Sequence, residues 1–105
     1  MVISISLQAE GDGLESLLNG EREPGFERDV YVGSMKVLKT FVDMAILRGV
    51  VDRDDQDYTQ RILGNVLNGL PADSKYREQI RDWVDKVSRP QEYLDSLRSR
   101  GSSAA

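Results

Sequence analysis

Cysteine and histidine are both absent from the 105 residues of this chain. Their absence rules out disulfides, the Ser-His-Asp and Cys-His arrangements of nucleophilic catalysis, and the usual zinc sites. An enzyme built on carboxylates would need two acids in a shaped pocket with their pKa values pushed apart. The acids of this chain fall instead in predicted loops and on hydrophilic helix faces. We therefore expect a protein that binds without catalysis, without a cofactor and without a metal.

Long apolar runs and an excess of positive charge are also missing. Nothing approaches the roughly 18 consecutive apolar residues that a membrane-spanning helix requires, and residues 1–8 lack the basic segment of a signal peptide. The formal net charge of −4 disfavours a general binder of nucleic acid or of anionic membranes. Because a cysteine-free chain suits a reducing compartment, we expect a cytoplasmic protein.

The glycines and aspartates form no ligand-binding motif. Neither G-x-G-x-x-G nor a Walker-type run occurs. The densest acidic cluster, Asp52 to Asp57, resembles a calcium loop only superficially, because Asp57 takes the glycine position and Leu63 takes the place of the bidentate Glu. Aspartates at a helix start cap free N–H groups and complement the helix dipole. The cluster therefore predicts a helix start.

What the sequence does contain is helical periodicity. The composition, 39% hydrophobic and 30% charged, is that of one globular domain. Apolar residues three and four apart predict three main helices, with shorter ones before and after them. We expect the main helices at about 30–48, 54–68 and 74–87. The predicted fold is an all-α bundle, with an N-terminal extended arm at 1–12, a helical domain at 13–97 and a flexible C-terminal tail at 98–105.

The N-terminal residues have a different period. Met1 to Gln8 alternates apolar and polar side chains, which is typical of a short β-strand, and Gly11 then interrupts the pattern. A lone strand needs partners for its backbone N–H and C=O groups. Residues 26–32 offer such a partner within the chain if the long helix begins late. Otherwise the arm would pair with a second subunit or extend the sheet of another protein.

These features favour a protein–protein interaction or assembly module, regulatory or adaptor in type. The first long helix is apolar on more than one side, which fits either a helix at the centre of the bundle or one that gives a face to a partner. We expect the partner to be a second copy of the chain, giving a homodimer or higher oligomer. The predicted partner-binding residues are Ile3, Ile5, Leu7, Val37, Met44, Val50 and Val51.

The alternative is a small nucleic-acid-associated regulatory protein. Basic residues gather in the third main helix and beyond it, within residues 75–100, although acids are interleaved with them. A solvated helix face explains the same mixture of charges. The residues that would contact nucleic acid under this alternative are Lys75, Arg77, Arg81, Lys86 and Arg89.

Overall fold

The computed structural model describes the backbone of residues 5–104 and the side chains of residues 5–97. The regular structure of this part of the chain is helical throughout, which confirms the predicted all-α class. The five helices are α1 (Ile5–Asn19), α2 (Phe26–Arg48), α3 (Arg53–Gly69), α4 (Arg77–Ser88) and α5 (Pro90–Ala104).

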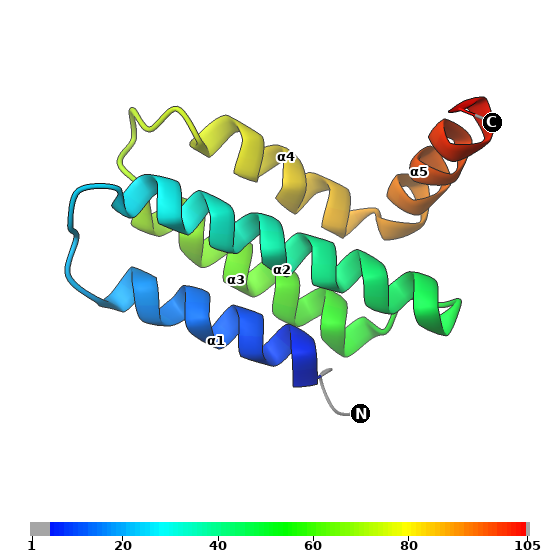
Figure 1. Ribbon diagram of the computed structural model, residues 1–105, viewed down its shortest axis with the longest axis horizontal. Coiled ribbons are helices and arrows are strands. Elements are labelled where there is room, and N and C mark those ends of the chain that lie inside the picture. The colour runs from blue at the N-terminus through cyan, green and yellow to red at the C-terminus, as the bar shows by residue number, and fades with distance from the viewer. Residues whose placement is uncertain (1–4, 105) are drawn as a thin grey trace.

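Two antiparallel hairpins form the body of the molecule (Figure 1). Helices α1 and α2 make one hairpin, and α3 and α4 make the other. Helix α2 lies between α1 and α4 and passes in front of α3, whereas α5 leads away from the end of α4. The buried core draws on all five helices, for example through Leu7, Phe41, Ile62, Ile80 and Leu94.

Glycine and aspartate set the ends of the long helices. Gly25 and Gly49 flank α2 with φ angles of 89° and 74°, a left-handed conformation that favours glycine. The Gly49 N–H donates to the carbonyls of Ala45 and Ile46, which confirms the predicted stop. Asp52 caps α3 by accepting the N–H groups of Asp54 and Asp55, as the acidic cluster predicted.

The predicted N-terminal strand is wrong from Ile5 onward. Ile5 to Gln8 form the first turns of α1, and the predicted arm therefore does not extend through residues 5–12; its first four residues lie outside the described part of the chain. Leu7 and Leu14 are seven residues apart, so they lie on one helix face, and both are buried with Gly11 between them. Packing of that face outweighs the short alternation that suggested a strand.

Two other boundaries also differ from expectation. Helix α2 begins at Phe26, so residues 26–32 are helical and offer no strand for pairing. At the other end, α5 continues through Ala104, beyond the predicted end of the helical domain at residue 97. In the described part of the chain, the helices are too short or too polar to cross a membrane.

Candidate functional site

The predicted partner-binding residues do not share one surface. Leu7 and Val37 are fully buried in the core, so their assignment to a partner surface is wrong. Met44 is half-buried, and Val51 is half-buried against the core. Ile3 lies outside the described residues.

Of the six that lie within the described residues, two are strongly exposed. Ile5 is 83% exposed in the first turn of α1, and Val50 is 64% exposed in the turn between α2 and α3. Figure 1 shows the start of α1 and the α2–α3 turn at the same end of the bundle.

The burial of Val37 has a simple cause. Helix α2 packs against α1, α3 and α4, so a wide sector of its surface is covered by other helices. Val30, Val37 and Phe41 lie within that sector and are buried. Much of the apolar breadth of this helix is therefore explained by its central place in the bundle.

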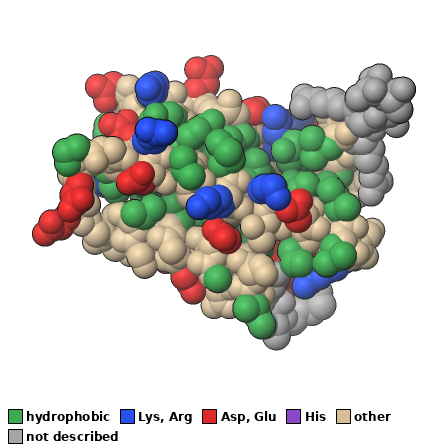
Figure 2. Space-filling model, in the orientation of Figure 1, with side chains coloured by type: hydrophobic (Ala, Val, Ile, Leu, Met, Phe, Trp, Pro, Cys, Tyr) green, Lys and Arg blue, Asp and Glu red, His purple; other side chains and the backbone are tan. Residues whose placement is uncertain are grey.

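A second sector of α2 is exposed, and we call it the outer face of α2. It lies between α1 and α4 and faces the viewer in Figures 1 and 2, where hydrophobic side chains are interspersed with basic and acidic ones. Its residues, including the turn that follows the helix, are Val32, Met35, Lys36, Lys39, Asp43, Ile46, Leu47 and Val50.

Aliphatic side chains dominate the C-terminal end of this face. Ile46 is 57% exposed and Leu47 is 78% exposed, and Val50 follows within the same turn. Single exposed apolar residues are ordinary on protein surfaces, but a cluster of large ones marks a candidate interaction site. The sequence pattern assigned Ile46 and Leu47 to the apolar stripe of the helix without indicating that they would be exposed.

The middle of the outer face carries a pair of opposite charges. Lys39 Nζ lies 2.8 Å from Asp43 Oδ2, and the two side chains are 76% and 57% exposed. The hydrogen bond to Asp43 raises the pKa of Lys39 above its ordinary value. Lys39 therefore remains charged near neutral pH.

A groove runs beside this face, between α1 and α2. Its volume is about 680 Å³, and Lys36 lines it together with Val32. Leu14 and Leu17 contribute apolar side chains from α1. Gly13 also lines the groove and, lacking a side chain, does not fill it. The groove thus continues the outer face of α2 toward α1.

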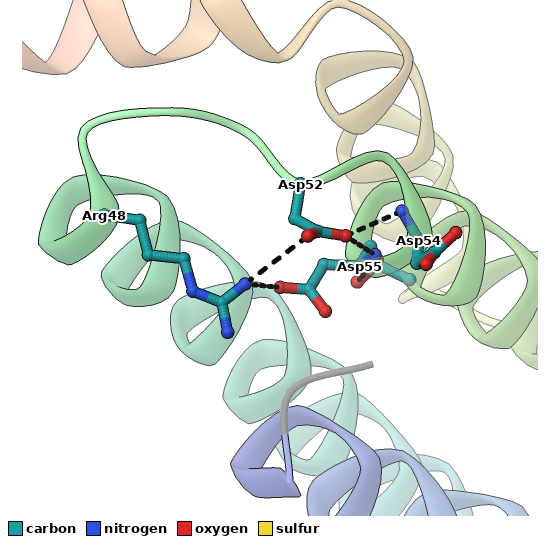
Figure 3. Close-up of polar contacts among 5 residues, drawn as sticks. Arg48, Asp52, Asp54 and Asp55 are labelled. Carbon is teal, nitrogen blue, oxygen red and sulfur yellow. Dashed lines mark hydrogen bonds and ion pairs between the residues drawn. The ribbon is translucent and has the colours of Figure 1, made fainter. Parts of the chain in front are cut away.

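An ionic network holds the α2–α3 turn in place (Figure 3). Arg48 extends from the end of α2 toward α3, and its Nη1 lies 3.1 Å from Asp55 Oδ2 and 3.7 Å from Asp52 Oδ2. Asp55 is buried while Arg48 is 38% exposed, so salt screens this ion pair less than it screens a fully exposed one. The network ties the segment that carries Ile46, Leu47 and Val50 to the first turn of α3.

The acidic cluster thus has a structural part in this turn. Asp52 Oδ1 accepts the N–H of Asp54 at 2.8 Å and that of Asp55 at 3.2 Å. Among the described residues, no group of three or more acidic side chains is arranged to hold a metal ion.

Four of the five basic residues assigned to a nucleic-acid surface interact within the chain. The Arg77 guanidinium donates to the carbonyls of Leu67 and Leu70, where it satisfies the C-terminal end of α3. The other contacts are Lys86–Asp82 at 3.0 Å, Arg89–Asp85 at 2.7 Å and the Lys75 ammonium 5.2 Å from the Tyr76 ring centre. Arg81, the fifth, is exposed on α4.

Aromatic stacking also serves the interior. The Tyr31 ring stacks on Tyr76 at 4.7 Å and on Trp83 at 5.3 Å between ring centres. These contacts join α2 to α4 and to the segment before it. The rings therefore contribute to helix packing, as expected for aromatic residues on apolar stripes.

Sequence reasoning missed one polar contact that locks α1 to α3. The Tyr58 hydroxyl lies 3.2 Å from both the Gln8 carbonyl and Asp12 Oδ1. Burial, and secondarily the Asp12 charge, raise the pKa of Tyr58 to about 12. A Cβ at Gly11 would lie 2.2 Å from the Tyr58 hydroxyl, so the glycine makes room for this ring. The glycine inside α1 was the available signal, but it was interpreted as a strand breaker.

Comparison with protein families, with curated proteins and with solved structures found no match to this chain.

Proposed function

We propose that this chain is a non-enzymatic protein–protein interaction module that binds its partner through the outer face of α2. The observation that carries the proposal is the cluster of Ile46, Leu47 and Val50, each more than half exposed within five residues of chain. Binding would bury these side chains and involve no covalent step. We also propose a cytoplasmic location, which the cysteine-free composition suits.

The energetic argument concerns apolar area. Complete burial of a Val, Leu or Ile side chain contributes roughly 1.5–3 kcal/mol relative to full exposure. Because these three side chains keep more than half of their surface in water, a partner that covers them gains on the order of 1 kcal/mol from each. That gain is enough to make this cluster the centre of an interface rather than its rim.

The rigid position of the cluster on the fold supports the same proposal. Ile46 and Leu47 belong to the last turn of a long helix, and the Arg48–Asp55 ion pair ties that turn to α3. A surface held in one conformation loses little conformational entropy on binding. The cluster is therefore suited to recognition without prior folding.

The nucleic-acid alternative has weaker support. Arg77 is engaged by two carbonyl groups, and Lys86 and Arg89 each have an acidic partner within 3.0 Å. Nucleic-acid binding depends on Lys and Arg side chains that neutralise phosphates and so release the counterions condensed on the nucleic acid. These three side chains already have partners within the chain. Protein binding is the function that the geometry favours.

Position-specific photo-crosslinking tests the proposal. A benzophenone amino acid would replace Leu47 in one variant and Asn65, an exposed residue on α3, in a matched control. We expect irradiation in cells to link the Leu47 variant to a protein in a discrete adduct, with no such adduct from the Asn65 variant. Equal labelling at both positions, or no adduct from Leu47, would contradict the proposed binding surface.

A further inference from the structure

We infer that the partner is a second copy of this chain, packed so that the outer faces of the two α2 helices run antiparallel about a two-fold axis. The inference rests on the proposed function, because it uses the same face. A second copy is favoured by the pattern of charged and apolar side chains along α2. This pattern is complementary to the same pattern read in the opposite direction along the helix.

The charged pair defines the centre of the pattern. Lys39 and Asp43 are exposed on the same face, and Phe41 lies midway between them in sequence. A two-fold axis at the level of Phe41, perpendicular to the helices, brings Lys39 of one copy opposite Asp43 of the other. The same axis brings Asp43 opposite Lys39, so two intermolecular ion pairs form together.

The same charges favour an antiparallel over a parallel orientation of the two α2 helices. A parallel arrangement in register would bring Lys39 beside Lys39 and Asp43 beside Asp43, which is repulsive. The antiparallel arrangement replaces both repulsions with attractions. Opposite charges in the middle of the face therefore favour one orientation and one register.

The apolar residues on either side agree with this register. Val32 of one copy reaches the level of Val50 of the other, and Met35 reaches the level of Ile46 and Leu47. All of these side chains are at least 39% exposed in the single chain. Each end of the interface would therefore join apolar to apolar side chains, apart from Lys36, which comes to the level of Ile46 of the other copy, and the ion pairs lie between the ends.

The groove beside α2 accommodates part of the contact. Leu47 and Lys36 are eleven residues apart, close to three helical turns, so they lie on the same side of α2. Lys36 lines the α1–α2 groove, together with Leu17. In the antiparallel arrangement, Leu47 of the second copy comes to the level of Lys36, beside that groove. Leu47, the most exposed residue of the cluster, would thus lie at the edge of this groove, near the side chain of Leu17.

The area of the outer face limits the affinity that we expect for the dimer. One helix face of this length, from Val32 to Val50, covers less than the ~800 Å² per partner of a standard interface. We therefore expect a reversible dimer with a dissociation constant on the order of 10–100 μM.

Charge exchange between copies tests the inference. Sedimentation equilibrium of the wild-type chain should fit a monomer–dimer equilibrium. Lys39→Asp and Asp43→Lys each place like charges opposite one another twice per dimer, so each alone should weaken association about tenfold or more. An equimolar mixture of the two variants, or the double variant with both changes, should restore association at low salt.

Asp82→Lys is the matched control. Like Asp43→Lys, it breaks an exposed i, i+4 pair and changes the charge by the same amount, but on α4. It should leave association unchanged, and circular dichroism should confirm the helix content of every variant. A wild-type chain that stays monomeric to about 1 mM would overturn the inference, and so would a dimer that is indifferent to the Lys39 and Asp43 changes.

The two proposals fail separately. If the purified chain is monomeric while the Leu47 crosslinker captures a different protein in cells, the dimer is excluded and the binding face stands. If the purified chain dimerises but Leu47 yields no adduct, the face proposed for binding is wrong.

Discussion

The two faces of α2 have similar apolar character but different neighbours. The inner face carries Val30, Val37 and Phe41, and α1, α3 and α4 cover it. The outer face carries Val32, Met35 and the Ile46–Val50 cluster, and the described helices leave it exposed.

This contrast teaches that apolar content does not separate core from interface. Both faces follow the helical period, and both contain large aliphatic residues. The outer face differs in carrying charge, through Lys36 and the Lys39–Asp43 pair, whereas the buried face of α2 has no charged side chain. Truncations on the two faces should therefore have very different consequences for folding.

The largest expected effect comes from breaking the inner face. Phe41→Ala removes a buried ring at the centre of the bundle and should lower the free energy of unfolding by about 3–5 kcal/mol. Leu47→Ala on the outer face should change it by no more than about 0.5 kcal/mol. Urea unfolding of dilute protein measures both. A comparable loss from Leu47→Ala would mean that the outer face is covered within the single chain.

The next effect tests the packing of α1 against Tyr58 of α3. Gly11→Ala forces a Cβ against Tyr58 and should lower the free energy of unfolding by about 1–3 kcal/mol. Gly13→Ala, two residues away with nothing within 4 Å of its new Cβ, should instead stabilise α1 by about 0.5–1 kcal/mol. Thermal unfolding of the pair gives the opposite signs directly. Equal effects would show that α1 does not pack on Tyr58.

A smaller effect is expected at the α2–α3 turn, where Arg48 pairs with Asp55. Arg48→Met removes the cation that pairs with buried Asp55 and should cost about 1–2 kcal/mol, reduced from the value for a fully buried pair because Arg48 is partly exposed. Arg53→Met, an exposed change in the first turn of α3, is the control. Denaturant unfolding at neutral pH compares them. If both variants match the wild type, the ion pair does not hold the turn.

The smallest effect tests the polar contact between α1 and α3. Tyr58→Phe removes the hydroxyl that reaches Gln8 and Asp12 and should cost about 0.5–1.5 kcal/mol near neutral pH.

The same tyrosine predicts an alkaline dependence. Its pKa rises from about 10 in the unfolded chain to about 12 in the folded one. The protonated hydroxyl therefore stabilises the fold fully below pH 10, and that contribution is lost as the pH rises through 12. The difference between the tyrosine absorbance titrations of the wild-type chain and Tyr58→Phe isolates the pKa of Tyr58 from those of the other three tyrosines, and Tyr58→Phe should lack this part of the alkaline loss. A difference curve centred near pH 10 would contradict the buried contact.

Much of the helical framework was predictable from local signals. Gly49 and the Asp52 cap act within one or two turns of chain, so their effects follow from the residues themselves. The start of the chain was not predictable in this way. Residues 1–8 alternate like a strand, but the burial of Leu7 depends on contacts with residues far along the chain.

The candidate site was predictable only in outline. Excess apolar surface on the first long helix is evident from the sequence, and Val50, one of the residues predicted to bind a partner, is exposed. Val37 was placed there as well, although it is buried. Ile46 and Leu47 were not singled out, because they fit the apolar period as well as their buried neighbours do.

Spacing and composition were enough to predict a helical fold and the ends of most of its helices, and to exclude chemistry that needs cysteine or histidine. The tertiary structure alone decided which apolar residues are covered. Helical periodicity tells which residues share a face, because it depends only on spacing along one helix. Whether that face meets another helix depends on how distant segments pack, and this is why Val37 is buried while Leu47, on the same helix, remains exposed.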